Sequence, residues 1–425
     1  MSKQKNDLFW ERIFNEYDIV ERVLSEGFFL ISAIEINKFR EARLMTKFDH
    51  RSQLPKLFVK NNLSILPCTR GKYLIGPFET FCDFDTNPVE IAKIEFPSFL
   101  ESLDYRNITS EATAINCAFV SKILQDFTNE ENLFPTVSGR MSSSVFGFNI
   151  NSAQGLSEIS VENAQIEIDG GFEGDFSLNL IEAKNYIADD FIIRQLYFPY
   201  KLWTNKISKK VRPIFLTYTN GVFHLREYAF DDINHYNSLR LVNQKKYVIQ
   251  EPVNIEIIQQ IIETVKIQNE PEIPFPQADS FERVINLCEL LMQKGFMSKE
   301  EITQNYDFDY RQANYYSSAG KYLGLIDSKQ KEGQAICFLT EKGKRIFTLP
   351  FYDRQIEFIK IILSHTAFKE TLKNYFRNGE MPGKNEIAEI MKRSNLYRIN
   401  SDSTYFRRAS TITGWINWIM SQIEE

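Results

Sequence analysis

Residues 165–184 hold the pattern that most restricts how this chain can fold. Gln165–Gly171 alternates apolar and polar side chains, which is the period of a β-strand, and Leu178–Lys184 is a second, mostly apolar strand segment. Glycines at the end of the first segment and just after it predict a tight turn. The stretch therefore predicts a β-hairpin whose second strand is buried.

Three charged side chains are expected to meet at the end of this hairpin. Side chains two positions apart on a strand point to the same face, so Glu182 and Lys184 share a face, and the turn can bring Asp169 beside them. Carboxylate oxygens can hold Mg²⁺, which lowers the pKa of a bound water and offsets charge on a phosphate. A lysine beside them can orient that water or neutralise the phosphate. The expected chemistry is hydrolysis of phosphodiester bonds with Mg²⁺ as the cofactor.

The alternative is a surface hairpin whose acid and lysine pair in solvent. A Glu-x-Lys triplet is common by chance in a chain with 25% charged residues. Glu182 follows an almost wholly apolar run, however, so its strand is expected to be buried, where an unpaired charge is costly.

Asp169 followed by Glu182-x-Lys184 on the next strand resembles the PD-(D/E)xK nuclease superfamily, and especially its type II restriction endonucleases. The resemblance implies an α/β, restriction-endonuclease-like core with the order αβββαβ and a mixed sheet. It also implies Asp169 and Glu182 as metal ligands and Lys184 as a catalytic residue. The elements expected in that order are a helix over 109–128, a strand over 145–150, the hairpin, a helix over 189–205 and a strand over 211–218.

The chain departs from the family motif at one position. Ile168 stands where the motif has a proline, which leaves Glu167 and Asp175 as rival metal ligands. Asp169 is preferred because it is expected at the end of its strand, where the hairpin opens.

Three further candidates come from the same resemblance and its surroundings. Glu111 begins the first core helix, where these nucleases often place an extra acid near the metal, although the helix dipole alone also explains an acid there. Gln195 matches a glutamine that some of these nucleases carry on the next helix, where it would support the water or the lysine; otherwise it caps a core helix. Arg140 would hold a phosphate or read a guanine edge, or else lie on a surface loop.

The C-terminal third has a different, mainly helical pattern. Glu270–Pro276 contains three prolines and is expected to be an extended linker. Three helices and a two-stranded wing over 277–350 resemble a winged helix-turn-helix, and a capping box at 298–301 opens the second helix. Residues 351–425 resemble a second helix-turn-helix unit. The expected DNA contacts are Arg311, Gln312, Asn314 and Tyr315 on the third helix, and Arg407 and Arg408 near the C-terminus.

Four segments are therefore expected: 1–100, 101–270, 277–350 and 351–425. The first is an α+β module in which 43–76 is rich in basic residues, either facing DNA or simply solvated. The second is the nuclease core, which is expected to be followed by an irregular connection over 231–273 that contains one helix. Winged helices also bind proteins, so the alternative for the third segment is that it docks a protein and does not contact DNA.

Composition excludes several other classes. With 425 residues, 43% of them hydrophobic, the chain is expected to form two or three globular domains. No apolar run approaches the ~20 residues of a membrane span, so no membrane partner is expected. The five cysteines and four histidines are scattered, which argues against disulfides and zinc and favours a cytoplasmic location. The net charge of −6 is uneven, because 281–425 carries 21 basic and 18 acidic residues, a balance of +3.

The leading hypothesis is a type II restriction endonuclease that cuts double-stranded DNA at a specific site. The resemblance further implies a bacterial cytoplasm, a separately encoded DNA methyltransferase, and a homodimer as one possible assembly. Two alternatives are a DNA-binding regulator with an inactive nuclease-like core and a structure-selective repair or recombination nuclease. No Walker-type loop is present, so no built-in motor is expected.

Overall fold

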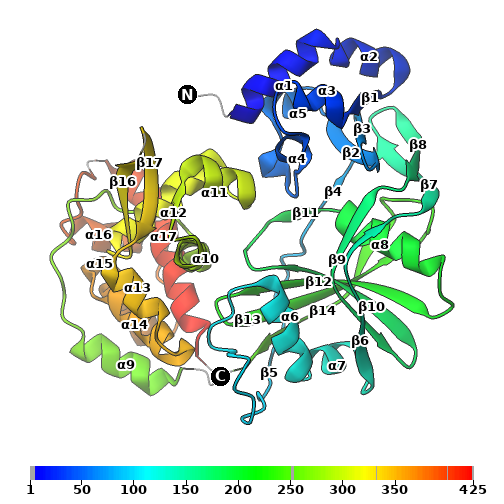
Figure 1. Cartoon of the computed structure of the whole chain (residues 1–425). Coiled ribbons are helices and arrows are strands. Elements are labelled where there is room, and N and C mark those ends of the chain that lie inside the picture. Colours follow the sequence, from blue (N-terminus) through cyan, green and yellow to red (C-terminus); the bar gives the residue numbers. More distant parts are fainter. Residues whose placement is uncertain (1–4, 250–252, 332, 400, 424–425) are drawn as a thin grey trace. The chain divides into compact units, whose positions relative to one another are not determined.

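The computed structural model describes residues 5–249, 253–331, 333–399 and 401–423 (Figure 1). Internal contacts divide the chain into two compact units. Unit 1 comprises Met1–Tyr218 and Val222–Val248, and unit 2 comprises Thr219–Gly221 and Ile249–Glu425. The four segments expected from the sequence thus group into two bodies, each with mixed α and β structure.

The N-terminal part of unit 1 combines short helices with a five-stranded sheet of order β1-β3-β2-β8-β7. The strands are β1 Phe29–Ser32, β2 Ser64–Thr69, β3 Lys72–Gly76, β7 Val145–Ser152 and β8 Gly155–Glu162. The helices are α1 Lys5–Glu16, α2 Ile19–Glu26, α3 Ala33–Asn37, α4 Ala42–Thr46 and α5 Lys56–Lys60, with a 3-10 turn at Arg51–Gln53. Trp10, Phe14 and Phe58 pack edge to face at the centre of this layer. β2 and β8 pair across the expected boundary at residue 100, so 1–100 is not a separate sheet.

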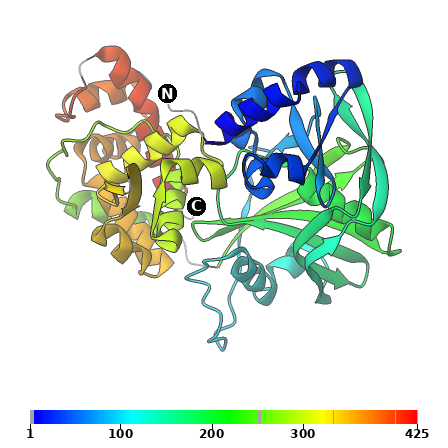
Figure 2. The ribbon, with the colours of Figure 1, turned by 45° about the horizontal axis from the view of Figure 1, so that its top comes forward.

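The second sheet of unit 1 has seven strands in the order β5-β14-β13-β12-β10-β9-β6. Figure 2 shows several of its strands in green. Its strands are β5 Ile91–Lys93, β6 Leu133–Ser142, β9 Gln165–Gly174, β10 Ser177–Lys184, β12 Lys210–Thr219, β13 Val222–Phe230 and β14 Leu239–Val248. A small sheet pairs β4 Phe81–Asp83 with β11 Asp190–Ile192. β10 runs antiparallel to β9 and parallel to β12, so the seven-stranded sheet is mixed.

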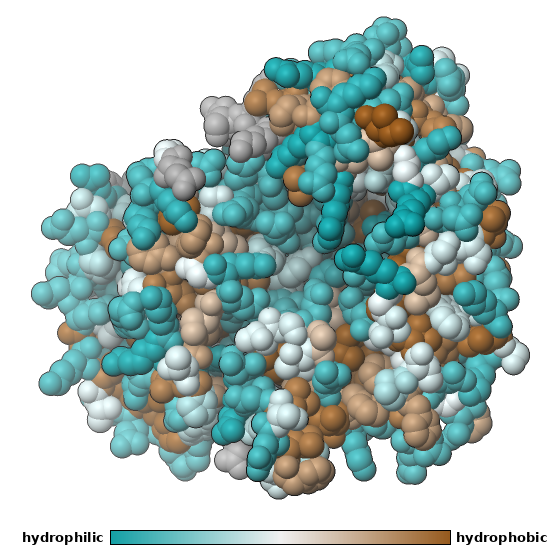
Figure 3. Space-filling model, viewed as in Figure 1, coloured by the Kyte–Doolittle hydropathy of each residue, from teal (hydrophilic) through white to brown (hydrophobic). Residues whose placement is uncertain are grey.

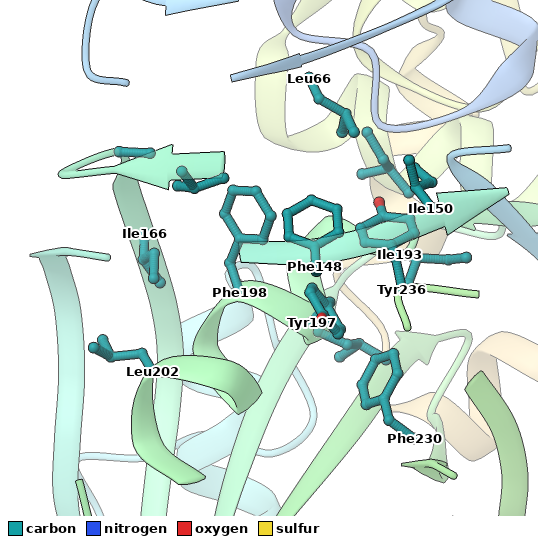
Figure 4. Packing of buried hydrophobic residues seen from close by; sticks show 14 of the residues in the cluster. Leu66, Phe148, Ile150, Ile166, Ile193, Tyr197, Phe198, Leu202, Phe230 and Tyr236 are labelled. Carbon is teal, nitrogen blue, oxygen red and sulfur yellow. The ribbon is translucent and has the colours of Figure 1, made fainter. Parts of the chain in front are cut away.

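Helices α6 Glu111–Val120 and α8 Arg194–Thr204 both pack against β9 and β10, and α7 Ile123–Thr128 follows α6. The core around α8 is aromatic (Figure 4). Phe148 of β7 stacks on Tyr236 and contacts Tyr197 and Phe198 of α8 edge to face. This cluster joins the two sheets, because it holds side chains from both of them.

Three sequence expectations for unit 1 were wrong. The 145–150 strand belongs to the five-stranded sheet, and β6 takes its expected place beside the hairpin. The connection after residue 231 contains a strand, β14, which pairs with β13 along its length. Gly170 and Gly171 lie within β9 and not in the turn. A Cβ on Gly171 would come within 2.8 Å of Val137 Cβ on β6, so this glycine permits close strand packing.

Unit 2 is mainly helical and carries one small sheet of order β15-β17-β16. Its helices are α9 Ile255–Thr264, α10 Phe281–Lys294, α11 Lys299–Asn305, α12 Tyr310–Tyr322, α13 Glu341–Phe347, α14 Phe351–Leu363, α15 Thr366–Asn378, α16 Lys384–Lys392 and α17 Asp402–Met420. Its strands are β15 Phe296–Ser298, β16 Ile326–Lys331 and β17 Gln334–Leu339, and Glu332 lies outside the described residues. The capping box expected at the start of α11 is confirmed, with Ser298 and Glu301 bonded reciprocally.

The proline-rich segment before α10 is packed and is not a free linker. Phe275 is fully buried, stacks on Phe368 and meets Tyr322 edge to face. The carboxylate of Glu270 accepts a hydrogen bond from the Tyr322 hydroxyl at 2.5 Å and lies 3.2 Å from His365 Nδ1. Prolines extend this stretch, but the buried side chain of Phe275 anchors it in the core of unit 2.

The surface agrees with the composition. The face shown in Figure 3 is covered mainly by hydrophilic side chains, with hydrophobic ones in scattered groups. Within the described ranges, none of the helices combines the length and apolar character that crossing a bilayer requires.

Candidate functional site

Strand β10 places two charged side chains on one face of a buried strand. All of its residues are buried, and it is flanked by β9 on one side and β12 on the other. Because side chains alternate along a strand, Glu182 and Lys184 point the same way. Lys184 Nζ donates a hydrogen bond to Glu182 Oε1 at 2.5 Å. The pairing offsets part of the cost of burying each charge.

Asp169 joins this pair from β9. Direct β9–β10 pairing runs to Ile181 opposite Gly170, and two residues further along β10 the Ala183 amide donates to Asp169 Oδ2 at 2.8 Å. The carboxylate therefore takes the place of a backbone partner and is held beside β10. In the described part of the chain, no hydrogen-bond donor reaches Asp169 Oδ1 or Glu182 Oε2. Each acid thus keeps one oxygen for another ligand.

The first turns of two helices complete the cluster. Gln195, in the first turn of α8, donates from Nε2 to Glu182 Oε1 at 2.7 Å. Its own Oε1 is buried and has no partner among the described residues. Glu111, at the start of α6, lies 3.8 Å from Lys184 Nζ and is partly exposed. The structure therefore brings together all five residues that the sequence predicted for this site.

Burial governs the electrostatics of the cluster. It raises the pKa of Glu182 to about 8, and Asp169 adds to this effect, while Lys184 opposes it. Burial also raises the pKa of Glu111, which again Lys184 opposes. For Lys184 burial alone would lower the pKa, but the surrounding Glu182, Tyr186, Glu111 and Asp169 raise it well above its ordinary value. Lys184 is therefore a fixed cation, and Glu182 is poised to lose a proton when a cation approaches.

Asp49 is a nearby residue that the sequence did not predict. It is buried, and its carboxylate opposes ionisation of both Glu111 and Glu182. Burial would raise the pKa of Asp49, but Lys47 and Lys184 lower it overall. Asp49 lies far from the hairpin in sequence and belongs to no motif, so only the fold brings it to the site.

A buried histidine and a buried tyrosine lie beside the cluster and are hydrogen-bonded to each other. His50 Nε2 lies 2.9 Å from the Tyr186 hydroxyl, and His50 Nδ1 lies 2.7 Å from the Asp190 carbonyl oxygen. Tyr186 comes two residues after Lys184 on the chain and is also buried. The sequence placed His50 in the basic stretch 43–76 as a surface residue, whereas the structure buries it completely.

The rival acids lie apart from this cluster. Glu167 is exposed and pairs with Arg140 at 3.2 Å. Asp175 lies in the turn after β9 and accepts from Asn132 at 3.1 Å. It is six residues from Asp169 along the strand, or roughly 20 Å. Arg140 lies on strand β6 and not on a loop, and its guanidinium is engaged by Glu167.

The predicted DNA contacts of unit 2 differ in how free their side chains are. On α12, Arg311 and Tyr315 are exposed. Gln312 caps its own helix by accepting from the Asp309 amide, and Asn314 donates to the Tyr310 carbonyl at 3.0 Å. On α17, Arg407 is exposed and Arg408 is partly buried, and they are considered further below.

Three family models match consecutive parts of the chain, and each is described as a domain of unknown function. They cover residues 7–75 (DUF6996), 76–248 (DUF6997) and 283–424 (DUF7226). The second ends at Val248, where unit 1 also ends. No match was found among curated proteins or among solved structures.

Proposed function

We propose that unit 1 is a Mg²⁺-dependent endonuclease of the PD-(D/E)xK type that hydrolyses phosphodiester bonds in double-stranded DNA. The observation that carries the proposal is the buried Lys184–Glu182 pair beside Asp169, in which each acid keeps one oxygen free of donors from the described part of the chain. A buried cation among carboxylates is costly to maintain, so a catalytic use gives a reason for it.

The order of elements supports the proposal. Helix α6, strands β6, β9 and β10, helix α8 and strand β12 follow the order αβββαβ, with α7 inserted after α6, the β7–β8 hairpin after β6 and the short strand β11 after β10. The proposed catalytic strand, β10, lies between an antiparallel and a parallel neighbour. Both helices bring a first-turn side chain to the Glu182–Lys184 pair, Gln195 to Glu182 and Glu111 to Lys184.

The donor set fits Mg²⁺, which prefers oxygen ligands and keeps several of its waters. Within the described residues, the oxygens of Asp169, Glu182 and Glu111 do not all lie within 4.8 Å of one another. Asp169 and Glu182, each with one oxygen that accepts from no donor among the described residues, would hold the ion, and Glu111 beside Lys184 is a further candidate ligand. When bound, Mg²⁺ would supply an activated water and offset the charge on the scissile phosphate.

The side chains around the ion have distinct tasks in this proposal. Lys184 carries its ammonium at all relevant pH values and would stabilise the charge that develops on the phosphate oxygens. Gln195 fixes the orientation of Glu182 through its amide and offers its unpaired Oε1 to a water. Asp169 is held in place by the Ala183 amide.

Unit 2 would supply DNA recognition as a winged helix. Helix α10, strand β15, helices α11 and α12, and the β16–β17 hairpin occur in the order of that motif, and α12 exposes Arg311 and Tyr315. A type II restriction enzyme of a bacterial cytoplasm would need a separately encoded methyltransferase to protect the host DNA. A homodimer would fit cleavage of palindromic sites.

Incubation of plasmid DNA with the full chain and Mg²⁺ tests the proposal. A discrete set of fragments, absent with EDTA, is expected for a restriction enzyme. Cleavage only at branched or nicked DNA would indicate a structure-selective nuclease. DNA binding without cleavage would indicate a regulator with an inactive core, and would overturn the proposal.

Substitution of each acidic residue by its amide tests which of these residues bind the metal. Asp169→Asn and Glu182→Gln should abolish cleavage, because each removes a charged metal ligand of nearly unchanged size. Asp175→Asn and Glu167→Gln change the rival acids in the same way and should cut like the parent. Loss of cleavage in Asp175→Asn or Glu167→Gln, with Asp169→Asn still active, would move the metal site.

A further inference from the structure

Arg408, in the N-terminal half of α17, is a partly buried cation, two of whose nitrogens find no partner among the residues that the structure describes. Its Nε and NH1 atoms are buried and make no hydrogen bond within the described part of the chain. No carboxylate pairs with it there. Buried polar groups in native proteins are almost always bonded, so these two nitrogens need an explanation, and a site that binds an anion is one.

The chain pairs a comparably buried arginine elsewhere. Arg212 in unit 1 makes a two-armed contact with Glu227, with donor distances of 2.9 and 2.6 Å. Arg408 instead has the exposed Arg407 beside it, and Tyr315 is the nearby group that favours its charge. Its pKa is lowered by burial and further by Arg407. A second cation at this position raises the need for an anion.

Tyr315 ties this position to α12. Arg311 and Tyr315 are four residues apart on that helix and therefore lie on the same face. Both are exposed. Tyr315 lies near enough to Arg408 to favour its charge, and this pair links the two helices. We call Arg311, Tyr315, Arg407 and Arg408 together the α12–α17 patch. Arginine is the side chain best shaped to hold a phosphate with two hydrogen bonds.

We propose that Arg408 is a phosphate-binding residue and that the α12–α17 patch grips the backbone of the same DNA that α12 contacts. This inference rests on the proposed DNA binding by unit 2 and does not require cleavage by unit 1. Arg408 would position the duplex, since phosphate contacts carry no sequence information of their own. Free inorganic phosphate offers the same chemistry, and the experiment separates the two sources.

Binding of the full chain to a labelled duplex is measured by fluorescence anisotropy with Ca²⁺ in place of Mg²⁺, at several salt concentrations. Arg408→Met should weaken binding about tenfold or more and lower the slope of log affinity against log salt by about one. Arg377→Met removes an exposed arginine from α15 of the same unit and should leave both unchanged. Arg407 is exposed, so the Arg407→Met variant is expected to fold. Like Arg408→Met, it should weaken DNA binding and lower the salt slope.

A stability measurement distinguishes a ligand site from a structural arginine. Without DNA, Arg408→Met should melt at the same or a higher temperature than the parent, because it removes an unpaired buried charge. A lower melting temperature for Arg408→Met together with unchanged binding in Arg407→Met would overturn the proposal. It would also be overturned if the parent did not bind DNA.

Inorganic phosphate alone serves as the second probe. If 10 mM phosphate raises the melting temperature of the parent and not of Arg408→Met, while DNA affinity is the same for both, the residue serves a small free anion and the DNA assignment is wrong. If DNA affinity falls in Arg408→Met although no Mg²⁺-dependent cleavage is found, the inference stands and the nuclease proposal fails.

Discussion

At the scale of single residues, the site depends on a cation that burial alone would neutralise. Lys184 keeps its charge because carboxylates surround it, and Glu182 holds it at 2.5 Å. The same closeness means that removal of Glu182 would leave the Lys184 ammonium less compensated, and removal of Lys184 would make ionisation of Glu182 still more costly. Effects on catalysis must therefore be separated from effects on folding and binding.

Lys184→Ala should slow the chemical step and leave DNA binding nearly intact, because the ammonium is proposed to act on charge that develops only in the transition state. We expect single-turnover cleavage with enzyme in excess to fall about 100-fold or more. Affinity for DNA in Ca²⁺ should change by less than about threefold. Lys210→Ala, at an exposed lysine that begins β12, is the control. Normal cleavage by Lys184→Ala at saturating enzyme would reduce the residue to a phosphate anchor.

Metal affinity should depend on pH because the Glu182 proton must leave before the ion can bind. The pKa of Glu182 is raised from 4.5 to about 8, so the acid is mostly protonated below that pH. Affinity for Mn²⁺, used as a calorimetric probe, should therefore rise by up to about tenfold per pH unit from pH 6 to about 8 and level off above it. Calorimetry in buffers of different ionisation enthalpy should detect about one proton released per ion below pH 8. An affinity that stays flat from pH 6 to 9, or is unchanged in Glu182→Gln, would contradict this.

At the scale of secondary-structure elements, close backbone approaches decide which elements can pack. Gly171 lets β9 lie against β6, and Gly414 lets α17 lie against the segment before α10. A Cβ on Gly414 would come within 1.9 Å of the Asp279 carbonyl oxygen. Trp415 next to it donates to the Ala278 carbonyl at 2.7 Å, which holds the same contact.

Gly414→Ala should destabilise unit 2, although alanine favours helices. The added methyl group would clash with the backbone of the segment before α10, and moving that backbone costs free energy. We expect a loss of about 2 kcal/mol or more, which lowers the melting temperature of the transition of unit 2 by roughly 4–8 °C. Calorimetric scanning of the full chain resolves this. Asn417→Ala, at an exposed position of the same helix, should leave the transition unchanged or slightly raised. Equal melting of the two variants would show that the helix can shift.

At the scale of the whole molecule, two units of different character share one chain. Unit 1 has two sheets joined by an aromatic core. Unit 2 has a helical core in which Phe281 of α10 contacts Phe358, Trp415 and Trp418. This core unites the segments 277–350 and 351–425, which the sequence suggested were separate.

The boundary of unit 2 can be tested by truncation. A fragment of residues 253–425 should fold, whereas 277–425 should be less stable by about 3–5 kcal/mol, because it loses buried Phe275 and leaves the pocket against Tyr322 and Phe368 open. It also removes Val265, whose carbonyl accepts from Lys369 Nζ at 2.9 Å. Urea denaturation of the two fragments measures the difference. Equal midpoints would restore the interpretation of 270–276 as a linker.

Local patterns in the sequence determined much of the site. Alternation over 165–184 determined the β9–β10 strands, and spacing of two put Glu182 and Lys184 on one face, as the 2.5 Å contact confirms. The capping box at Ser298 determined where α11 begins. These features depend on residues within a few positions of one another, so the sequence alone contains their physical cause.

Tertiary structure decided what local patterns cannot express. A strand's period does not say which sheet it joins, so 145–150 was assigned to the wrong one, and β14 was missed because polar residues interrupt its alternation. The sequence suggested a turn at Gly170 and Gly171, because the neighbours on α6 and β6 that require glycine at these positions are distant in sequence. Asp49 and His50 reach the site for the same reason. Packing and burial join segments that are far apart along the chain, and only the folded molecule brings their side chains within contact distance.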